Sequence, residues 1–221
     1  MITLVLEAST YAGSVAVIDG SAVLAERAVA MRGREHEALM PAVSEVLEAA
    51  GLSVLAIERV VCGSGPGSFT SLRIAGAIAK GIALASSVPL VPISSLALLV
   101  ASREPQVPGQ FVAVVDAMRG ERYVQAFAVG GSGEMTSVGG LHILAAPEVA
   151  QMAHTLGATV LGPGEQGASL VVPRAGAAAR ITNMIETAGE AFLGGWEPGY
   201  GRLAEAQVKW EAEHGRPLQP G

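Results

Sequence analysis

The sequence predicts a duplicated α/β protein whose two halves each carry a mixed β-sheet flanked by helices. In both halves a meander of strands comes first, and helices and strands then alternate. The stretches 4–18 (LVLEASTYAGSVAVI) and 112–126 (VAVVDAMRGERYVQA) also match in pattern, with Glu7 opposite Asp116. Such a repeat indicates that one unit occurs twice. Halves of this kind usually face each other across a cleft.

The first half shows the periods of strands and helices in turn. The apolar residues Leu39, Val43 and Val46 fall at helical spacing, and Gly51 follows as a stop signal. Ser68 or Thr70 is expected to cap the next helix. We expect strands over 2–9, 14–19, 22–30, 58–62 and 88–93, and helices over 36–50, 69–86 and 94–102.

A break rich in proline and polar residues, REPQVPGQ at 103–110, predicts the boundary between two domains, 1–102 and 103–202. The second domain is expected to be the smaller α/β unit. A helix at about 203–214 is expected to pack back on the first. We expect a strand, a turn and a strand in 111–129, a loop or hairpin over 130–140, a strand over 141–145, helices over 147–157 and 175–193, and a strand between them.

The segment VCGSGPGSFTSLRIAGAIAKG, residues 61–81, resembles a phosphate-binding loop that enters a helix. Both nucleotide motifs fail, because Ser68 stands where each requires its last glycine and no lysine follows. A helix N-terminus still attracts anions. The sequence therefore favours a structural glycine turn, with Glu7, Gly65, Gly67 and Asp116 as weak candidates for nucleotide binding.

Other chemistry finds little support. The four histidines do not pair at metal-ligand spacing, and no serine lies in a nucleophile elbow, so no catalytic residue, metal site or cofactor is predicted. A net charge of −6 argues against tRNA binding by this chain alone. One cysteine suits a reducing compartment, and we expect a cytoplasmic protein. Residues 81–102 are uncharged, but Pro89 and Pro92 argue against a membrane span.

The helix expected over 69–86 has two stripes of small residues. Ala75, Ala79 and Ala83 form one, and Ala77, Gly81 and Ala85 the other. Small residues at this spacing let another backbone approach closely. One stripe is expected to pack beneath the sheet and the other to remain available to a partner helix. The sequence does not decide which stripe does which.

Several motifs together resemble the TsaB (YeaZ) family: LVLEAST at 4–10, REH at 34–36, GSGPGSFTSLRI at 63–74, AKGIAL at 79–84 and VVDAMRGERY at 114–123. The resemblance extends over residues 1–130 and returns at PGYGRLAEAQVKWE. It implies the actin/Hsp70/sugar-kinase fold, with ribonuclease H-like halves. It also implies a role in forming N6-threonylcarbamoyladenosine at position 37 of tRNA.

The resemblance implies a non-catalytic scaffold and activating subunit, with ATP and metal held by its partner subunits. The partners would be a TsaD-type subunit and a TsaE-type ATPase, with tRNA reached only through the complex and a homodimer formed by the chain alone. Ser95 and Leu99 stand where TsaD carries two metal-binding histidines, and Glu7 where the family usually has aspartate. The implied partner surface is formed by helices 36–50 and 69–86, with Arg34, His36, Ser68, Leu72, Ala75, Ala79 and Ala83.

Two other functions stay open. Kinases of the implied fold use carboxylates at two strand ends with Mg²⁺ and ATP, and Glu7 and Asp116 occupy such positions in an alternative, enzymatic function. A peptidase activity has been attached to relatives of this superfamily. No nucleophile–base pair in the sequence supports that activity.

Overall fold

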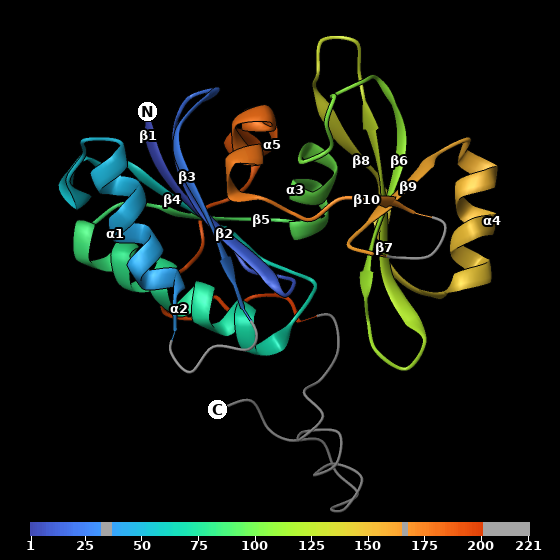
Figure 1. Ribbon diagram of the computed structural model, residues 1–221, viewed down its shortest axis with the longest axis horizontal. Coiled ribbons are helices and arrows are strands. Elements are labelled where there is room, and N and C mark those ends of the chain that lie inside the picture. Colours follow the sequence, from blue (N-terminus) through green and yellow to red (C-terminus); the bar gives the residue numbers. More distant parts are fainter. Residues whose placement is uncertain (32–36, 165–167, 201–221) are drawn as a thin grey trace, which may run out of the picture.

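The computed structural model describes residues 1–31, 37–164 and 168–200. Over these residues the chain forms two five-stranded mixed sheets in five layers (Figure 1). Two helices cover the outer face of sheet A, a helical layer lies between the sheets, and one helix covers the outer face of sheet B. The predicted helix at 203–214 and the residues Arg34 and His36 lie outside the described residues.

Sheet A contains the first five strands, in the order β3-β2-β1-β4-β5. β1 pairs with β2 in antiparallel and with β4 in parallel orientation, so the sheet is mixed as predicted. Helices α1 and α2 pack on one face through a core of aliphatic side chains and alanines. The elements are β1 (Ile2–Glu7), β2 (Ala12–Asp19), β3 (Ala22–Ala30), α1 (Leu39–Ala49), β4 (Arg59–Gly63), α2 (Phe69–Ser86) and β5 (Leu90–Ile93), with a 3-10 turn, η1 (Val54–Ala56), before β4.

Sheet B has the order β10-β9-β6-β7-β8 and repeats the plan of sheet A, with two antiparallel pairings followed by two parallel ones. The prediction of a hairpin or loop over 130–140 is confirmed for the hairpin turn at 130–134, but it was wrong for 135–140, because a single strand begins at Met135 and runs through Gly139 and Gly140. Gly139 has a φ of +80°, which glycine adopts without strain. The elements are β6 (Gly109–Asp116), β7 (Glu121–Val129), β8 (Met135–Ala145), α4 (Ala146–Leu156), β9 (Thr159–Gly162) and β10 (Ser169–Leu170).

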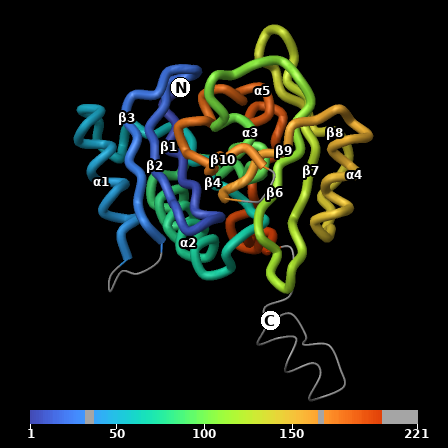
Figure 2. The backbone as a smooth tube through the Cα atoms, turned by 45° about the vertical axis from the view of Figure 1, so that its right-hand side comes forward, coloured from blue at the N-terminus to red at the C-terminus, as the bar shows by residue number. Residues whose placement is uncertain are grey.

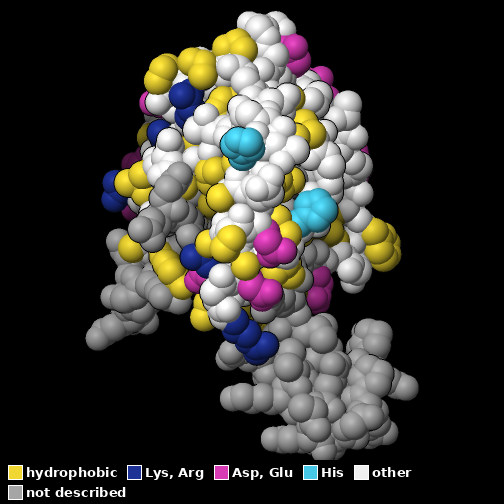
Figure 3. All heavy atoms as spheres, turned by 90° about the vertical axis from the view of Figure 1, so that its right-hand side faces the viewer, with side chains coloured by type: hydrophobic (Ala, Val, Ile, Leu, Met, Phe, Trp, Pro, Cys, Tyr) yellow, Lys and Arg dark blue, Asp and Glu magenta, His cyan; other side chains and the backbone are white. Residues whose placement is uncertain are grey.

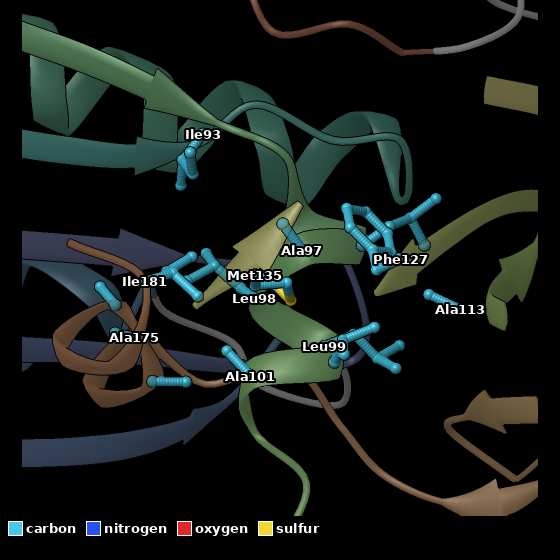
Figure 4. Packing of buried hydrophobic residues seen from close by; sticks show 14 of the residues in the cluster. Ile93, Ala97, Leu98, Leu99, Ala101, Ala113, Phe127, Met135, Ala175 and Ile181 are labelled. Atoms are coloured by element: carbon cyan, nitrogen blue, oxygen red, sulfur yellow. The ribbon is translucent and has the colours of Figure 1, made fainter. Parts of the chain in front are cut away.

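The space between the two sheets is filled by protein. Helix α3 (Ser95–Ala101) is buried along its whole length, and Leu98 and Leu99 pack with Phe127 and Met135 of sheet B (Figure 4). The same apolar cluster includes Val5 and Ile93 of sheet A. Among the described residues, one continuous core therefore joins the two halves where a cleft was expected.

The helix predicted over 175–193 was wrong in type and in length. The chain instead forms a 3-10 helix, η2 (Ala175–Arg180), and a short α-helix, α5 (Thr182–Thr187). The first N–H groups of η2 are hydrogen-bonded to sheet A, since Ala175 N donates to Ser14 Oγ (2.7 Å) and Gly176 N to the Glu26 carboxylate (2.8 Å). These distant partners fix the run of alanines against β2 and so override its local preference for an α-helix.

Candidate functional site

The carboxyl group of Glu7 lies at the end of β1 in the centre of the molecule. It is fully buried. The backbone N–H of Ser9 donates to one of its oxygens (2.5 Å) and the hydroxyl of Ser95 donates to the other (2.8 Å). The Ser95 hydroxyl in turn accepts the N–H of Gly65 (3.1 Å). Glu7 therefore connects β1, the glycine-rich loop and the first residue of α3.

Burial decides the protonation of this acid. Desolvation raises the pKa of Glu7, and the hydrogen bonds from Ser9 and Ser95 oppose the rise without cancelling it. Burial and the neighbouring Glu7 also raise the pKa of the Cys62 thiol. A nucleotide-bound magnesium ion needs exposed, ionised carboxylates. The burial of Glu7 disfavours that ionised form and suits a structural role instead.

Stability is expected to change with pH because of Glu7. Its pKa in the folded state lies above the unfolded value near 4.5, so its contribution is fully present below that pH and is lost as pH rises through the folded pKa. Glu7→Gln keeps the shape without the titration. We expect thermal melts to show that the melting temperature of Glu7→Gln rises relative to that of the wild type as the pH increases above about 4.5. The exposed Glu48→Gln is the control, and parallel pH profiles for Glu7→Gln and wild type would contradict the assignment.

Three glycines of the loop face protein atoms. A Cβ on Gly63 would lie 1.9 Å from Glu7 Oε2, one on Gly65 would lie 2.4 Å from the carbonyl oxygen of Gly199, and one on Gly67 would lie 2.1 Å from that of Ser9. The loop is also tied down, because Ser68 N donates to Ser9 O (2.7 Å). The glycines therefore have structural reasons for their small size that involve no ligand.

Asp116, the other carboxylate of the predicted pair, has different surroundings. It is exposed, its carboxylate accepts the N–H of Met118 (2.9 Å), and it forms an ion pair with Arg122 (3.7 Å). The hydrogen bonds and ion pairs of the described residues do not link it to Glu7. Within the same residues no three His, Cys, Asp or Glu side chains gather as metal ligands. The two carboxylates therefore differ in burial and in partners, with Glu7 enclosed and Asp116 exposed.

Helix α2 presents one of its two small-residue stripes to solvent. Leu72, Ala75, Ala79 and Ala83 are fully buried against the core, so their predicted place on a partner surface needs correction. Ala77, Gly81 and Ala85 are exposed, and a Cβ on Gly81 would meet no atom within 4 Å. Arg73 and Leu84 are exposed beside these small residues. We call the face formed by Arg73, Ala77, Gly81 and Leu84 the exposed stripe of α2, and it is the face that a partner can reach.

Residues 188–200, which we call the strap, follow one flank of α2. Gly76 lies against the strap, since a Cβ there would come 3.1 Å from the Pro198 ring. Lys80 donates to the carbonyl oxygen of Trp196 (3.0 Å), and Gly199 N donates to Ser64 O (2.7 Å). The resemblance at PGYGRL was a sequence signal for this segment, but its path along α2 was not predicted.

The strap ends where the two halves meet at the start of α2. The ring of Tyr200 packs on Phe69, with ring centroids 4.5 Å apart, and Tyr123 of β7 donates its hydroxyl proton to the Tyr200 carbonyl (3.0 Å). Ser68 precedes α2 but makes no capping hydrogen bond with its side chain. Its hydroxyl bonds Ser71 Oγ instead (3.0 Å). The expected serine cap is therefore not formed at Ser68, and the strap borders the exposed stripe.

An open apolar groove of about 600 Å³ lies elsewhere, between β8 and α4. Figure 3 shows this side of the molecule, where hydrophobic side chains and histidines are exposed. Its lining includes His142, Leu144, Glu148 and Met152. None of the residues predicted for nucleotide binding lies there.

Comparison with known proteins identifies the family. The sequence profile of the family described as TsaD, tRNA N6-adenosine threonylcarbamoyltransferase, matches residues 30–185, well over half of the chain. The chain belongs to this family. Within it the chain lies in the TsaB (YeaZ) branch, as the motifs indicated.

Curated TsaB relatives align with this chain over part of their length. The tRNA threonylcarbamoyladenosine biosynthesis protein TsaB of Haemophilus influenzae is 34% identical over 121 residues, which cover 54% of this chain and 51% of the relative. TsaB of Escherichia coli is 33% identical over 122 residues, with 54% and 52% covered. The aligned region thus spans about half the length of the curated relatives it matches.

Solved TsaB-like structures match over almost the whole fold. A Pseudomonas aeruginosa protein described as similar to peptidase YeaZ has a TM-score of 0.77 at 25% identity, covering 91% of this chain and 99% of that one. YeaZ from the same species has a TM-score of 0.73 at 26% identity, covering 86% and 95%. These matches confirm the predicted duplicated, actin-like α/β fold of the TsaB family. Within the described residues, no helix has the length and apolarity needed to cross a bilayer.

Proposed function

We propose that the protein is a non-catalytic scaffold and activating subunit of the complex that forms N6-threonylcarbamoyladenosine at position 37 of tRNA. It would pair with a TsaD-type subunit, help recruit a TsaE-type ATPase and reach tRNA only through the complex. The names of the relatives support the pathway. A single, fully buried cysteine fits a reducing compartment such as the cytoplasm.

The main observation that supports a non-catalytic role is the enclosed position of the Glu7 carboxyl group. Its oxygens are occupied by Ser9 and Ser95, and Gly63 packs directly on them. A metal ion or phosphate at this acid would have to break a buried hydrogen-bond network. ATP and metal are therefore proposed to belong to the partner subunits.

The surface proposed for pairing is the exposed stripe of α2 together with the neighbouring helix α1, which packs beside it. Ala77 and Gly81 let a partner helix approach closely, and Leu84 adds an apolar side chain that is 71% exposed. The same face would join two copies of this chain when the TsaD-type subunit is absent, which gives the expected homodimer.

Binding of the TsaD-type subunit from the same organism tests this proposal. We expect titration calorimetry to show a stable complex with the wild type and an affinity lower by about a hundredfold for Gly81→Arg, because the long side chain keeps a partner helix away. Gly81→Ala is the matched control, since it keeps the surface small and favours the helix.

Each outcome of the titration has a clear meaning. Arginine is a good helix former and the position is open, so Gly81→Arg should fold as well as the wild type. Loss of binding with unchanged thermal stability supports the surface. Full binding by a folded Gly81→Arg would contradict it, and a wild type that does not bind the TsaD-type subunit would contradict the proposed function.

A further inference from the structure

The turn between β6 and β7 has a backbone conformation that its residues do not favour. Met118, Arg119 and Gly120 all have positive φ, at +65°, +57° and +80°. Only the glycine adopts this region without cost, and hairpin turns of this kind usually carry Asn-Gly. The sequence thus keeps methionine and arginine at two strained backbone positions, where asparagine would relieve the strain.

The turn is closed by its own hydrogen bonds and exposes both side chains. Ala117 N donates to Glu121 O (3.0 Å), and Glu121 N donates to Met118 O (3.1 Å). The Met118 side chain is 59% exposed. Arg119 is exposed and makes no hydrogen bond or ion pair with any of the described residues. More than half of the methionine side chain and the guanidinium of Arg119 are therefore available to a partner.

The turn borders the proposed partner surface. Figures 1 and 2 both show it on the same side of the molecule as the beginning of α2. Contacts connect the two places step by step: Arg73 lies over the Phe69 ring (5.2 Å), Phe69 packs on Tyr200, and the Tyr200 carbonyl accepts the hydroxyl proton of Tyr123, two residues beyond the turn. A chain of contacts thus leads from the exposed stripe across the strap to Tyr123, which is buried in β7, and the exposed turn lies just before Tyr123 in the chain.

We propose that Met118 and Arg119 form a second contact point for the TsaD-type partner, on the C-terminal half of this chain. The inference rests on the proposed function and extends it from one helix face to a surface that spans both halves. The matching surface on the partner is an apolar depression with a carboxylate at its edge, because methionine fits irregular apolar surfaces and arginine binds carboxylates. Contact with both halves would fix the orientation of the partner.

A double variant, Met118→Asn with Arg119→Asn, separates this role from a structural one. Asparagine tolerates positive φ, so we expect the melting temperature to rise by about 4 °C. Affinity for the TsaD-type subunit, measured by calorimetry, should fall by about tenfold or more. If Met118 and Arg119 are kept for binding in spite of the backbone strain, replacing them should raise stability and lower affinity at the same time. Unchanged affinity, or a melting temperature that does not rise, would overturn the inference.

Two further variants complete the test. Ser87→Asn relieves a positive φ of +54° at the other end of α2 and should raise stability without weakening binding. Arg119→Glu keeps the strain and reverses the charge, and it should weaken binding without stabilising the fold. If Gly81→Arg abolishes binding while both Arg119 variants bind like the wild type, this inference fails and the proposed function stands. If the wild type itself does not bind, both fail.

Discussion

Gly63→Ala is expected to destabilise the protein by about 3 kcal/mol or more. The new methyl group would lie 1.9 Å from Glu7 Oε2 and 2.9 Å from Ser95 Oγ. The carboxyl group cannot move aside cheaply, because both of its oxygens hold buried hydrogen bonds and it is fully enclosed. Denaturant unfolding, followed by circular dichroism, measures the loss.

A double-mutant cycle with Glu7→Ala identifies the cause. Glu7→Ala alone leaves a cavity and removes the acceptor from Ser9 N and Ser95 Oγ, a loss of about 2–4 kcal/mol. In the double variant the methyl group added at position 63 enters the space that Glu7 leaves. We therefore expect the double variant to be more stable than the sum of the single losses by about 1 kcal/mol or more. Additive losses would show that Gly63 is small for another reason.

A control shows that glycine replacement is not harmful in itself. Gly81 lies in the exposed part of α2 with open space around it. Gly81→Ala should therefore stabilise the fold by up to about 1 kcal/mol. The two Gly→Ala replacements would then change the free energy of unfolding in opposite directions, and the difference in packing around Gly63 and Gly81 explains why.

Local periodicity predicted most of the fold. The alternating apolar residues of β1 to β7 and the helical spacing of α1 and α2 were sufficient, since these elements bury the faces that their own residues define. The prediction of an α-helix at the run AGAAAR, residues 175–180, failed for a physical reason. The N–H groups of this run are held by Ser14 and Glu26, which lie 161 and 150 residues away. The turn between β6 and β7 was predicted, but its positive φ angles at Met118 and Arg119 were not, because Met-Arg is not a typical sequence for such a turn.

The site shows the same limit more sharply. Glu7, the glycine loop and the repeat partner Asp116 were found from their spacing, but the atoms that explain the glycines come from Glu7, Ser9 and Gly199. The stripes Ala75/Ala79/Ala83 and Ala77/Gly81/Ala85 are chemically alike. The small residues alone do not show which of them is exposed, but the charged Arg73, four residues before Ala77, is a signal in the helix for the exposed stripe.

Formation of N6-threonylcarbamoyladenosine in a reconstituted system distinguishes a scaffold from an enzyme. A scaffold needs the exposed stripe of α2 and does not need the two carboxylates. We therefore expect Gly81→Arg to reduce the rate by about a hundredfold or more, because the partner no longer binds productively. The double variant Glu7→Gln with Asp116→Asn preserves the shape of both side chains and leaves each of them one oxygen that accepts hydrogen bonds, and it should retain most of the activity.

The decisive measurement is the rate of modified tRNA formation by the TsaD-type and TsaE-type subunits with each of these two variants in place of the wild type. The account predicts loss of activity with Gly81→Arg and normal activity with the carboxylate double variant. Normal activity with Gly81→Arg and its loss with a correctly folded Glu7→Gln/Asp116→Asn protein would contradict it, and would identify this chain as a nucleotide-dependent enzyme.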